Sequence, residues 1–235
     1  MAAPVDISFL PVVCGLRISH RGAVSAYAIV FQDDDLLVVN KPAGWSVARQ
    51  YRDQNGAEIL VEQLRSDRGE GVTPAHRIDA ELSGLVACAK TKPGLDFLSG
   101  QFQSKTAERV YRGVAVLATE AEAEQITGMP LVREPGGGLP AEFAVSYALA
   151  PDQHVAGRMH VYRRKGGRPA LTNFRVLEDF GRFVWLEARP ETSREMQVQA
   201  HLAAIGAPVL GDEAHGLPEV QLLLSNLKRG YKGRD

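Results

Sequence analysis

Short apolar segments separated by polar turns predict several β-strands. Residues 27–31 and 36–40 are apolar and flank the polar turn 32–35, a pattern typical of a β-hairpin. The segment 85–89 is also apolar, and because small or polar residues bound it closely we expect a buried strand. Polar and apolar side chains partly alternate along residues 108–117, which predicts one more strand.

Three other segments have the pattern of a helix. Residues 57–68 and 92–104 carry apolar side chains three and four positions apart, so one face of each can be buried. A third helix is expected to begin at Thr192 and Glu195, which have the spacing of a capping box, and to end at Gly206.

These elements together predict an α+β fold with a mixed, largely antiparallel sheet. A further hairpin is expected from residues 174–178 and 183–189, and one more strand from 142–149. The Gly- and Pro-rich segment 134–140 predicts a flexible loop, and we expect it to separate two sub-lobes of one domain spanning 26–235.

Size and charge leave several function classes open. The chain has 235 residues, which fits one large domain or two small ones, and residues 1–25 are expected to form an irregular lead-in. The formal net charge is −1, so the protein as a whole is not a polycation. Binding to a nucleic acid would therefore require a local concentration of basic residues.

Cysteine usage and hydropathy indicate the compartment. Cys14 and Cys88 have neither the spacing of a metal site nor that of a disulfide framework, which suits a reducing cytosol. The three aspartates at 33–35 are interpreted as a solvated turn rather than a metal site.

No signal peptide and no apolar run of membrane-spanning length is evident. We expect a cytoplasmic monomer that needs neither a metal nor a membrane.

A carboxylate next to basic residues is the first candidate for chemistry. Asp79 follows His76 and Arg77 at the mouth of the predicted strand 85–89, and Pro74 disfavours a helix there, so Asp79 should lie on an extended segment or loop. A nearby cation lowers an Asp pKa by about 1–3 units and would keep the group ionised. The alternatives are a structural Asp–Arg pair and a packing histidine.

Basic residues are concentrated between residues 158 and 175. They are Arg158, Arg163, Arg164, Lys165, Arg168 and Arg175, with no acidic residue among them. Tyr162 lies inside this stretch, and basic side chains with an aromatic ring suit an RNA backbone with a splayed base nearby. A solvated loop without a ligand is the alternative.

Four segments resemble the RluA-type RNA pseudouridine synthases. HRIDAELSGL at 76–85 is similar to the family signature HRLDxxTSGL, and FQDDDLLVVNKPAGW at 31–45 is similar to a strand leading into a KPxG turn. ERVYRGVAV at 108–116 resembles a K-x-Y-x-A-x-V segment, and RPETSREMQVQAHLAAIG at 189–206 resembles RPxTGRTHQIRxHLAxxG.

The resemblance implies roles for individual residues. Asp79 matches the catalytic Asp, Tyr111 matches a tyrosine that faces the active site, and Arg194 matches the arginine that pairs with the Asp. In the helix predicted from Thr192, Arg194 would lie in the first turn. Lys41 is expected at a strand end as a phosphate contact, although a solvated side chain is the alternative.

The resemblance also implies a fold and an activity. The fold would be a bent sheet in two halves with helices on the outer faces and a central cleft. The activity would be isomerisation of a uridine to pseudouridine in ribosomal or transfer RNA, without a cofactor. Arg77, His76, Arg163, Arg164 and Lys165 are the expected RNA contacts, and Arg77 is a candidate to fill the gap left by a flipped base. One alternative is a catalytically impaired RNA-binding homologue, and another is a hydrolase that uses Asp79 with Glu81 as a carboxylate pair.

Several letters depart from the family pattern. They are Leu82, Ser193, Glu195, Met196 and Gln199. The last three remove basic or polar groups next to the expected active site, so we expect them to weaken the RNA contacts more than the chemistry. The segment after residue 216 also lacks the usual final strand motif, so either that strand is missing or another segment closes the sheet.

Overall fold

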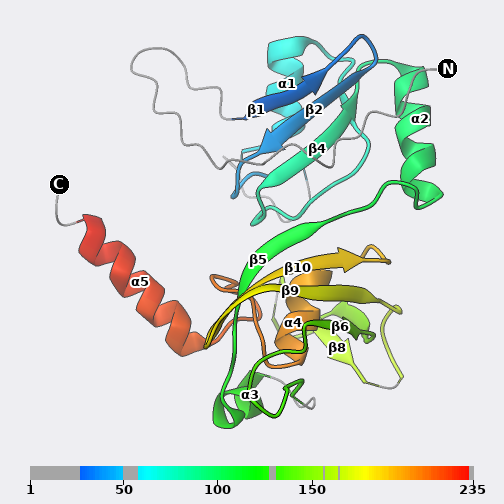
Figure 1. The fold of residues 1–235 in the computed structure, drawn as a ribbon. Helices are drawn as coiled ribbons and strands as arrows, with labels where there is room; N and C mark the ends of the chain where they lie inside the picture. The colour runs from blue at the N-terminus through cyan, green and yellow to red at the C-terminus, as the bar shows by residue number, and fades with distance from the viewer. Residues whose placement is uncertain (1–26, 50–57, 127–130, 156, 164, 233–235) are drawn as a thin grey trace. The chain divides into compact units, whose positions relative to one another are not determined.

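The computed structural model describes residues 27–49, 58–126, 131–155, 157–163 and 165–232. The predicted lead-in at 1–25 therefore lies outside the described residues. The chain forms two compact units, Met1–Ala107 and Glu108–Asp235 (Figure 1).

The first unit is built on an antiparallel sheet with the order β1-β2-β4-β3. Its strands are β1 (Ala28–Gln32), β2 (Leu36–Lys41), β3 (Thr73–Pro74) and β4 (Gly84–Ala89). Asp33 closes the β1–β2 turn, because its Oδ1 accepts the backbone N–H groups of Asp35 and Leu36 at 2.9 and 2.6 Å. The predicted hairpin, the buried strand and the solvated aspartate turn are all confirmed.

Two helices complete the first unit: α1 (Leu60–Arg68) and α2 (Lys92–Gln103). The buried face of α1 presents Leu60 and Leu64 to an apolar cluster that includes Leu37, Val39 and Val86 of the sheet. Both helices lie within or at the edge of the segments expected from periodicity. Thr91 caps α2, since its Oγ1 accepts the N–H of Gly94 at 3.2 Å.

The second unit contains an antiparallel sheet with the order β5-β10-β9-β6 and a separate two-stranded ribbon β7-β8. The strands are β5 (Tyr111–Val116), β6 (Glu142–Val145), β7 (Ala148–Pro151), β8 (Met159–Tyr162), β9 (Thr172–Phe180) and β10 (Phe183–Pro190). The helices are α3 (Glu120–Ile126), α4 (Gln197–Ala204) and α5 (Pro218–Lys232). The α+β class is confirmed, and all pairs between named strands are antiparallel.

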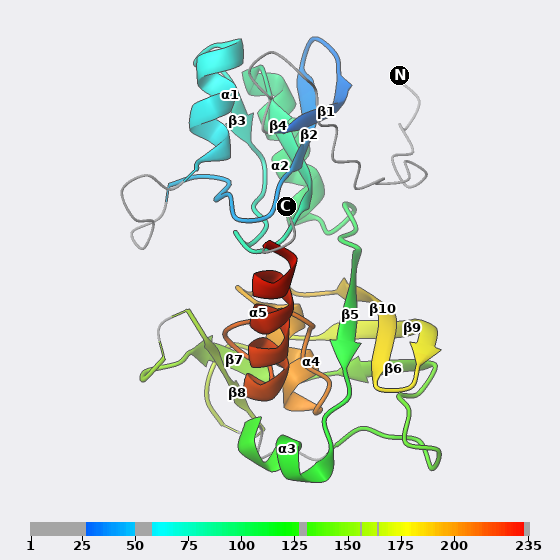
Figure 2. The ribbon, with the colours of Figure 1, turned by 90° about the vertical axis from the view of Figure 1, so that its left-hand side faces the viewer.

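Helix α4 covers one face of the second sheet. Phe174, Leu186 and Ala188 on that face pack with Leu202 of α4 and with Ile205 just after it. Helix α4 also lies beside the β7–β8 ribbon (Figure 2), where a second apolar cluster joins them. This helix is therefore packed on two sides, which explains why its residues are almost all buried.

The structure divides the chain at residue 107, not near 134–140 as the sequence predicted. Residues 134–138 form a turn closed by hydrogen bonds from Glu134 N to Gly138 O and from Gly137 N to Glu134 O, both 2.8 Å. Val132 before the turn and Leu139 after it join the same apolar cluster. A Gly-rich turn whose two flanks share one core does not separate two lobes.

Two further expectations differ from the structure. The strand expected at 142–149 is interrupted, so that β6 joins the main sheet and β7 pairs with β8. Beyond residue 217 the chain forms helix α5, where the family resemblance would place a final strand. None of the helices in the described ranges is both long enough and apolar enough to span a membrane.

Candidate active site

The predicted catalytic residues belong to different units. Asp79 lies in the loop between β3 and β4 of the first unit, as the sequence predicted, and the loop also carries His76 and Arg77. Tyr111 and Arg194 belong to the second unit.

The ammonium group of Lys41 is enclosed by backbone carbonyls. Its side chain is fully buried, and Nζ donates to the carbonyl oxygens of Pro42, Trp45, Ala80 and Leu82 at 2.8, 2.7, 3.2 and 2.7 Å. Burial lowers the pKa of Lys41 to about 8, although the nearby Glu81 and Asp79 carboxylates favour the charged form. Lys41 does not present its charge to solvent, so the expected phosphate contact is corrected to a structural role.

The turn after Lys41 is joined to the loop that carries Asp79. Gly44 N donates to Ala80 O at 2.7 Å, the same carbonyl that Lys41 contacts. Gly44 has φ +87°, a backbone conformation that residues with a Cβ atom rarely adopt. Within the loop, Leu82 N donates to Asp79 O at 3.1 Å. These bonds fix the backbone directly after Asp79, whose side chain is half-buried.

His76 is a packing histidine in this structure. Its Nε2 accepts the backbone N–H of Ala87 on β4 at 3.0 Å, and its ring centroid lies 4.6 Å from that of Phe102 on α2. A ring held in this way attaches the start of the Asp79 loop to the sheet, so the expected RNA contact at His76 is not supported. Arg77, the next residue, is exposed.

Tyr111 begins β5 and faces the core side of its sheet. It pairs with Ala188 of β10 and packs against the apolar cluster that contains Leu186 and Leu202. The side chain is only half-buried, so part of the phenol remains accessible.

Arg194 lies in a turn before α4, not in the first turn of a helix. Helix α4 begins at Gln197, and Met196 before it has a left-handed φ of 46°. The predicted capping box does not form, because Thr192 Oγ1 accepts Leu171 N at 3.0 Å and donates to Gln197 Oε1 at 2.9 Å. The Arg194 Nε is buried and has no hydrogen-bond partner within the described part of the chain.

Gln197 holds the Arg194 turn against β9. Its Oε1 accepts the N–H of Arg194 at 3.1 Å, and its Nε2 donates to Leu171 O and Thr172 Oγ1 at 3.0 and 2.9 Å. Sequence reasoning missed this residue, although a glutamine inside an apolar helical segment was a usable signal.

A buried histidine extends this network. His201 Nδ1 lies 3.0 Å from Thr172 Oγ1, and Nε2 lies 3.2 Å from Tyr147 O. Burial lowers the pKa of His201 to about 4, so the ring is neutral near pH 7. Met196 and Gln199, two of the departures from the family pattern, are also buried, so neither side chain faces solvent where RNA could contact it.

The basic stretch follows strand β8. Arg163 and Lys165 are exposed, whereas Arg164 lies outside the described residues. The backbone of Arg168 bridges to Leu149 of β7 through bonds of 2.9 and 2.8 Å, which fixes the far end of the stretch.

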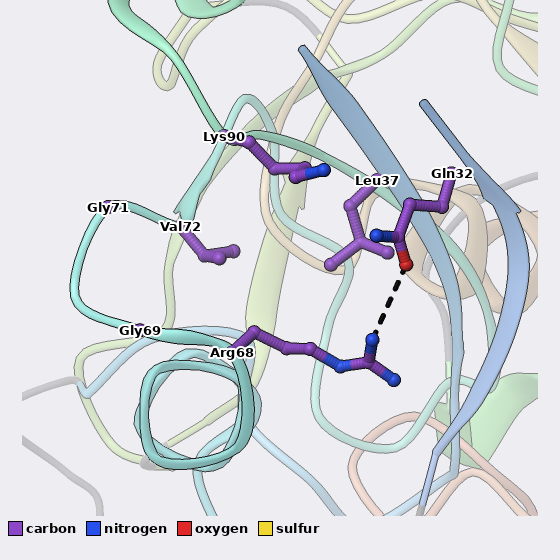
Figure 3. A pocket seen from close by; sticks show the side chains of 7 residues that line it. All are labelled: Gln32, Leu37, Arg68, Gly69, Gly71, Val72 and Lys90. Carbon is purple, nitrogen blue, oxygen red and sulfur yellow. Dashed lines mark hydrogen bonds between the residues drawn. The ribbon is translucent and has the colours of Figure 1, made fainter. Parts of the chain in front are cut away.

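A hollow in the first unit contains none of the predicted site residues. Its volume is about 360 Å³, and it is lined by Gln32, Leu37, Arg68, Gly69, Gly71, Val72 and Lys90 (Figure 3). Arg68 Nη1 donates across it to Gln32 Oε1 at 3.4 Å. Among the described residues, no three His, Cys, Asp or Glu side chains are grouped so that they could hold a metal ion.

Comparisons of this chain with a family model and with individual proteins agree on one protein family. The family model for RNA pseudouridylate synthase matches residues 35–204. Ribosomal large subunit pseudouridine synthase D of Neisseria meningitidis is 32% identical, over 82% of this chain and 47% of its own length. tRNA pseudouridine synthase C of Pectobacterium carotovorum is 28% identical, over 80% of this chain and 48% of its own length. This chain thus spans about half the length of these relatives.

A solved structure supports the fold. Human RNA pseudouridylate synthase domain containing 1 superposes with a TM-score of 0.65 and 21% identity, covering 86% of this chain and 75% of the human chain.

Proposed function

We propose that this chain, which belongs to the RNA pseudouridylate synthase family, converts a uridine to pseudouridine in ribosomal or transfer RNA. The names of its relatives include enzymes of both RNA classes, which supports the two substrates equally. In this reaction the N-glycosidic bond breaks, the uracil turns, and its C5 bonds to the ribose. The reaction is an internal rearrangement, so we expect it to need no cofactor.

Asp79 is the proposed catalytic carboxylate. The observation that carries this assignment is the set of hydrogen bonds that Lys41 and Gly44 make to the loop around it. A fixed carboxylate can attack the ribose carbon or accept a proton without first being ordered, which lowers the entropic part of the barrier. Both routes are compatible with the loop.

Arg194 and Tyr111 are proposed to act with Asp79. The buried Nε of Arg194 leaves a charged donor that a carboxylate would satisfy, and pairing with Asp79 would keep that carboxylate ionised. The accessible part of the Tyr111 phenol would stack on the flipped uracil. Arg163, Arg164 and Lys165 would contact the RNA backbone.

Arg77 is proposed to fill the gap that the flipped base leaves in the RNA stack. Unstacking the base costs about a few kcal/mol, and the inserted side chain would offset part of that cost. Its exposed position in the Asp79 loop supports this role. Arg77→Ala should slow modification of a folded stem-loop more than that of a short single strand. Equal slowing on both would reject the assignment.

The decisive experiment uses Asp79→Asn, with Glu81→Gln as a matched control in the same loop. Purified protein is incubated with ribosomal and transfer RNA, and pseudouridine and free uracil are measured. We expect pseudouridine from the wild-type protein and from Glu81→Gln, and only a residual rate, measured with the protein in excess over RNA, from Asp79→Asn. Free uracil, with activity lost in both variants, would instead indicate a hydrolase with a carboxylate pair. RNA binding with neither product would indicate a binding homologue.

A further inference from the structure

A local excess of positive charge lies beside the strands of the β7–β8 ribbon. The segment 148–168, which contains β7 and β8, has five basic residues and one acidic residue, a formal charge of +4 with His neutral. The whole chain carries −1, so the remaining residues are acidic in sum. Positive charge is therefore locally concentrated in this segment, which is the arrangement expected of a contact for RNA phosphates.

Two glycines after β8 allow the chain to approach the ribbon closely. A Cβ at Gly166 would lie 2.3 Å from the Tyr162 ring, and a Cβ at Gly167 would lie 2.7 Å from the backbone of Leu149. The chain therefore folds closely over the ribbon between Lys165 and Arg168. Lys165 directly precedes these close contacts, and both Arg163 and Lys165 are exposed.

One face of the ribbon packs against the start of α4, close in the chain to Arg194. Leu149 and Met159 join an apolar cluster with Met196, which directly precedes α4, and with Ala200 within α4. Met196 is two residues after Arg194 in the chain. Figure 2 shows the ribbon next to α4. Phosphates bound by the ribbon would thus lie near the Arg194 turn of the same unit.

One side-chain pair attaches the ribbon to the segment after α4. The backbone N–H of Met159 on β8 donates to His215 Nε2 at 3.0 Å. Since Nε2 accepts a hydrogen bond, the ring proton is on Nδ1, which faces Asp212 Oδ2 at 3.1 Å. The other oxygen of Asp212 accepts the backbone N–H groups of Ala214 and His215 at 2.9 and 3.1 Å.

We propose that the Asp212–His215 pair is a positioning device that holds the β7–β8 ribbon as an arm for RNA phosphates. The inference rests on the proposed function, since it takes RNA as the substrate. Both side chains of the pair are 4% exposed, so they do not contact RNA themselves. They act through β8, whose far end leads into Arg163 and Lys165.

Asp212→Asn tests the pair with almost no change in shape. The two backbone N–H groups require an oxygen at their position, so the asparagine must turn its NH₂ group toward His215 Nδ1. The ring would then carry its proton on Nε2 and could no longer accept the Met159 N–H. The variant therefore breaks the attachment of the ribbon by changing a tautomer.

The measurement is binding of a fluorescently labelled RNA stem-loop over a range of salt concentrations, with thermal unfolding recorded for each variant. We expect Asp212→Asn to weaken binding by about tenfold, which corresponds to the loss of one or two phosphate contacts. Arg163→Ala/Lys165→Ala should reduce the salt dependence directly. Arg182→Ala removes an exposed charge from the distant β9–β10 turn and should leave binding unchanged.

The combination of variants decides the question. If the pair acts through the ribbon, adding Asp212→Asn to Arg163→Ala/Lys165→Ala will cause no further loss of binding. An undiminished loss in that background, or unchanged binding in Asp212→Asn alone, would overturn the proposal. If Asp212→Asn is poorly folded, His215→Leu, which has no acceptor for Met159 N, should weaken binding, whereas His215→Gln, which retains one, should bind like the wild type. Equal binding by these two variants would overturn the proposal. A failure to form pseudouridine would reject the proposed function, whereas the binding assay would still test the ribbon.

Discussion

At the scale of single residues, the protein uses buried polar side chains to fix backbone segments. Lys41 is the clearest case, because one ammonium group contacts two carbonyls of the turn 42–45 and two of the proposed catalytic loop. Lys41→Met keeps the length of the side chain but removes its donors. We expect a loss of about 3 kcal/mol of stability, since several buried carbonyls lose a charged partner.

Hydrogen exchange is the measurement for Lys41→Met. The amides of residues 79–84 should exchange faster and kcat should fall. Lys90→Met, which removes a lysine whose Nζ donates to Asp33 O elsewhere on the same sheet, should leave exchange in that loop unchanged. Normal exchange of residues 79–84 in Lys41→Met would contradict the positioning role.

His201 makes stability depend on pH. Its pKa is about 4 in the folded protein and about 6.5 in an unfolded chain, so the unfolded state binds the extra proton between these values. The contribution is fully present above pH 6.5 and is lost as the pH falls toward 4, by about 3 kcal/mol in total. Thermal unfolding between pH 7 and 4.5 should show a smaller decrease for His201→Asn, and an identical decrease would contradict this assignment.

At the scale of elements, the start of α4 determines where Arg194 lies. Gln197 makes hydrogen bonds to the Arg194 backbone and to two groups at the start of β9. Gln197→Met has a similar volume but makes none of these bonds. We expect kcat to fall by at least tenfold while the dissociation constant for RNA changes by less than threefold, because the Arg194 turn is misplaced but the basic ribbon is intact.

Gln197→Glu serves as the conservative control for that variant. It retains an acceptor for the Arg194 N–H but cannot donate to Leu171 O, so an intermediate kcat is expected. Equal kcat values for wild type and Gln197→Met would show that the turn does not depend on this network.

The sequence predicted correctly those strands and helices whose position depends on neighbouring residues in the chain. The β1–β2 hairpin, β4 and the helices α1 and α2 follow from alternation, turn residues and helical spacing. The start of α4 was mispredicted because the Thr192 hydroxyl, a plausible helix cap, instead accepts the N–H of Leu171, which lies 21 positions away in the chain. The burial of Lys41 was missed for the same reason, since its acceptors include residues about 40 positions distant.

At the scale of the whole molecule, the proposed catalytic groups are divided between two units. Asp79 is held by its own loop contacts, whereas Arg194 and Tyr111 are held by the sheet and α4 of the second unit. The sequence resemblance predicted these three residues as one site, and that prediction requires the two units to work together. A double-mutant cycle tests this requirement directly.

Asp79→Asn, Arg194→Gln and the double variant form the cycle, with pseudouridine formation and RNA binding as readouts. If Arg194 acts by aiming and charging the Asp79 carboxylate, its loss has no further effect once that carboxylate is gone, because groups that act as a unit are not additive. We therefore expect the double variant to be no slower than Asp79→Asn. Independent, multiplicative losses would instead mean that Arg194 serves RNA binding alone, and that each unit contributes separately to the reaction.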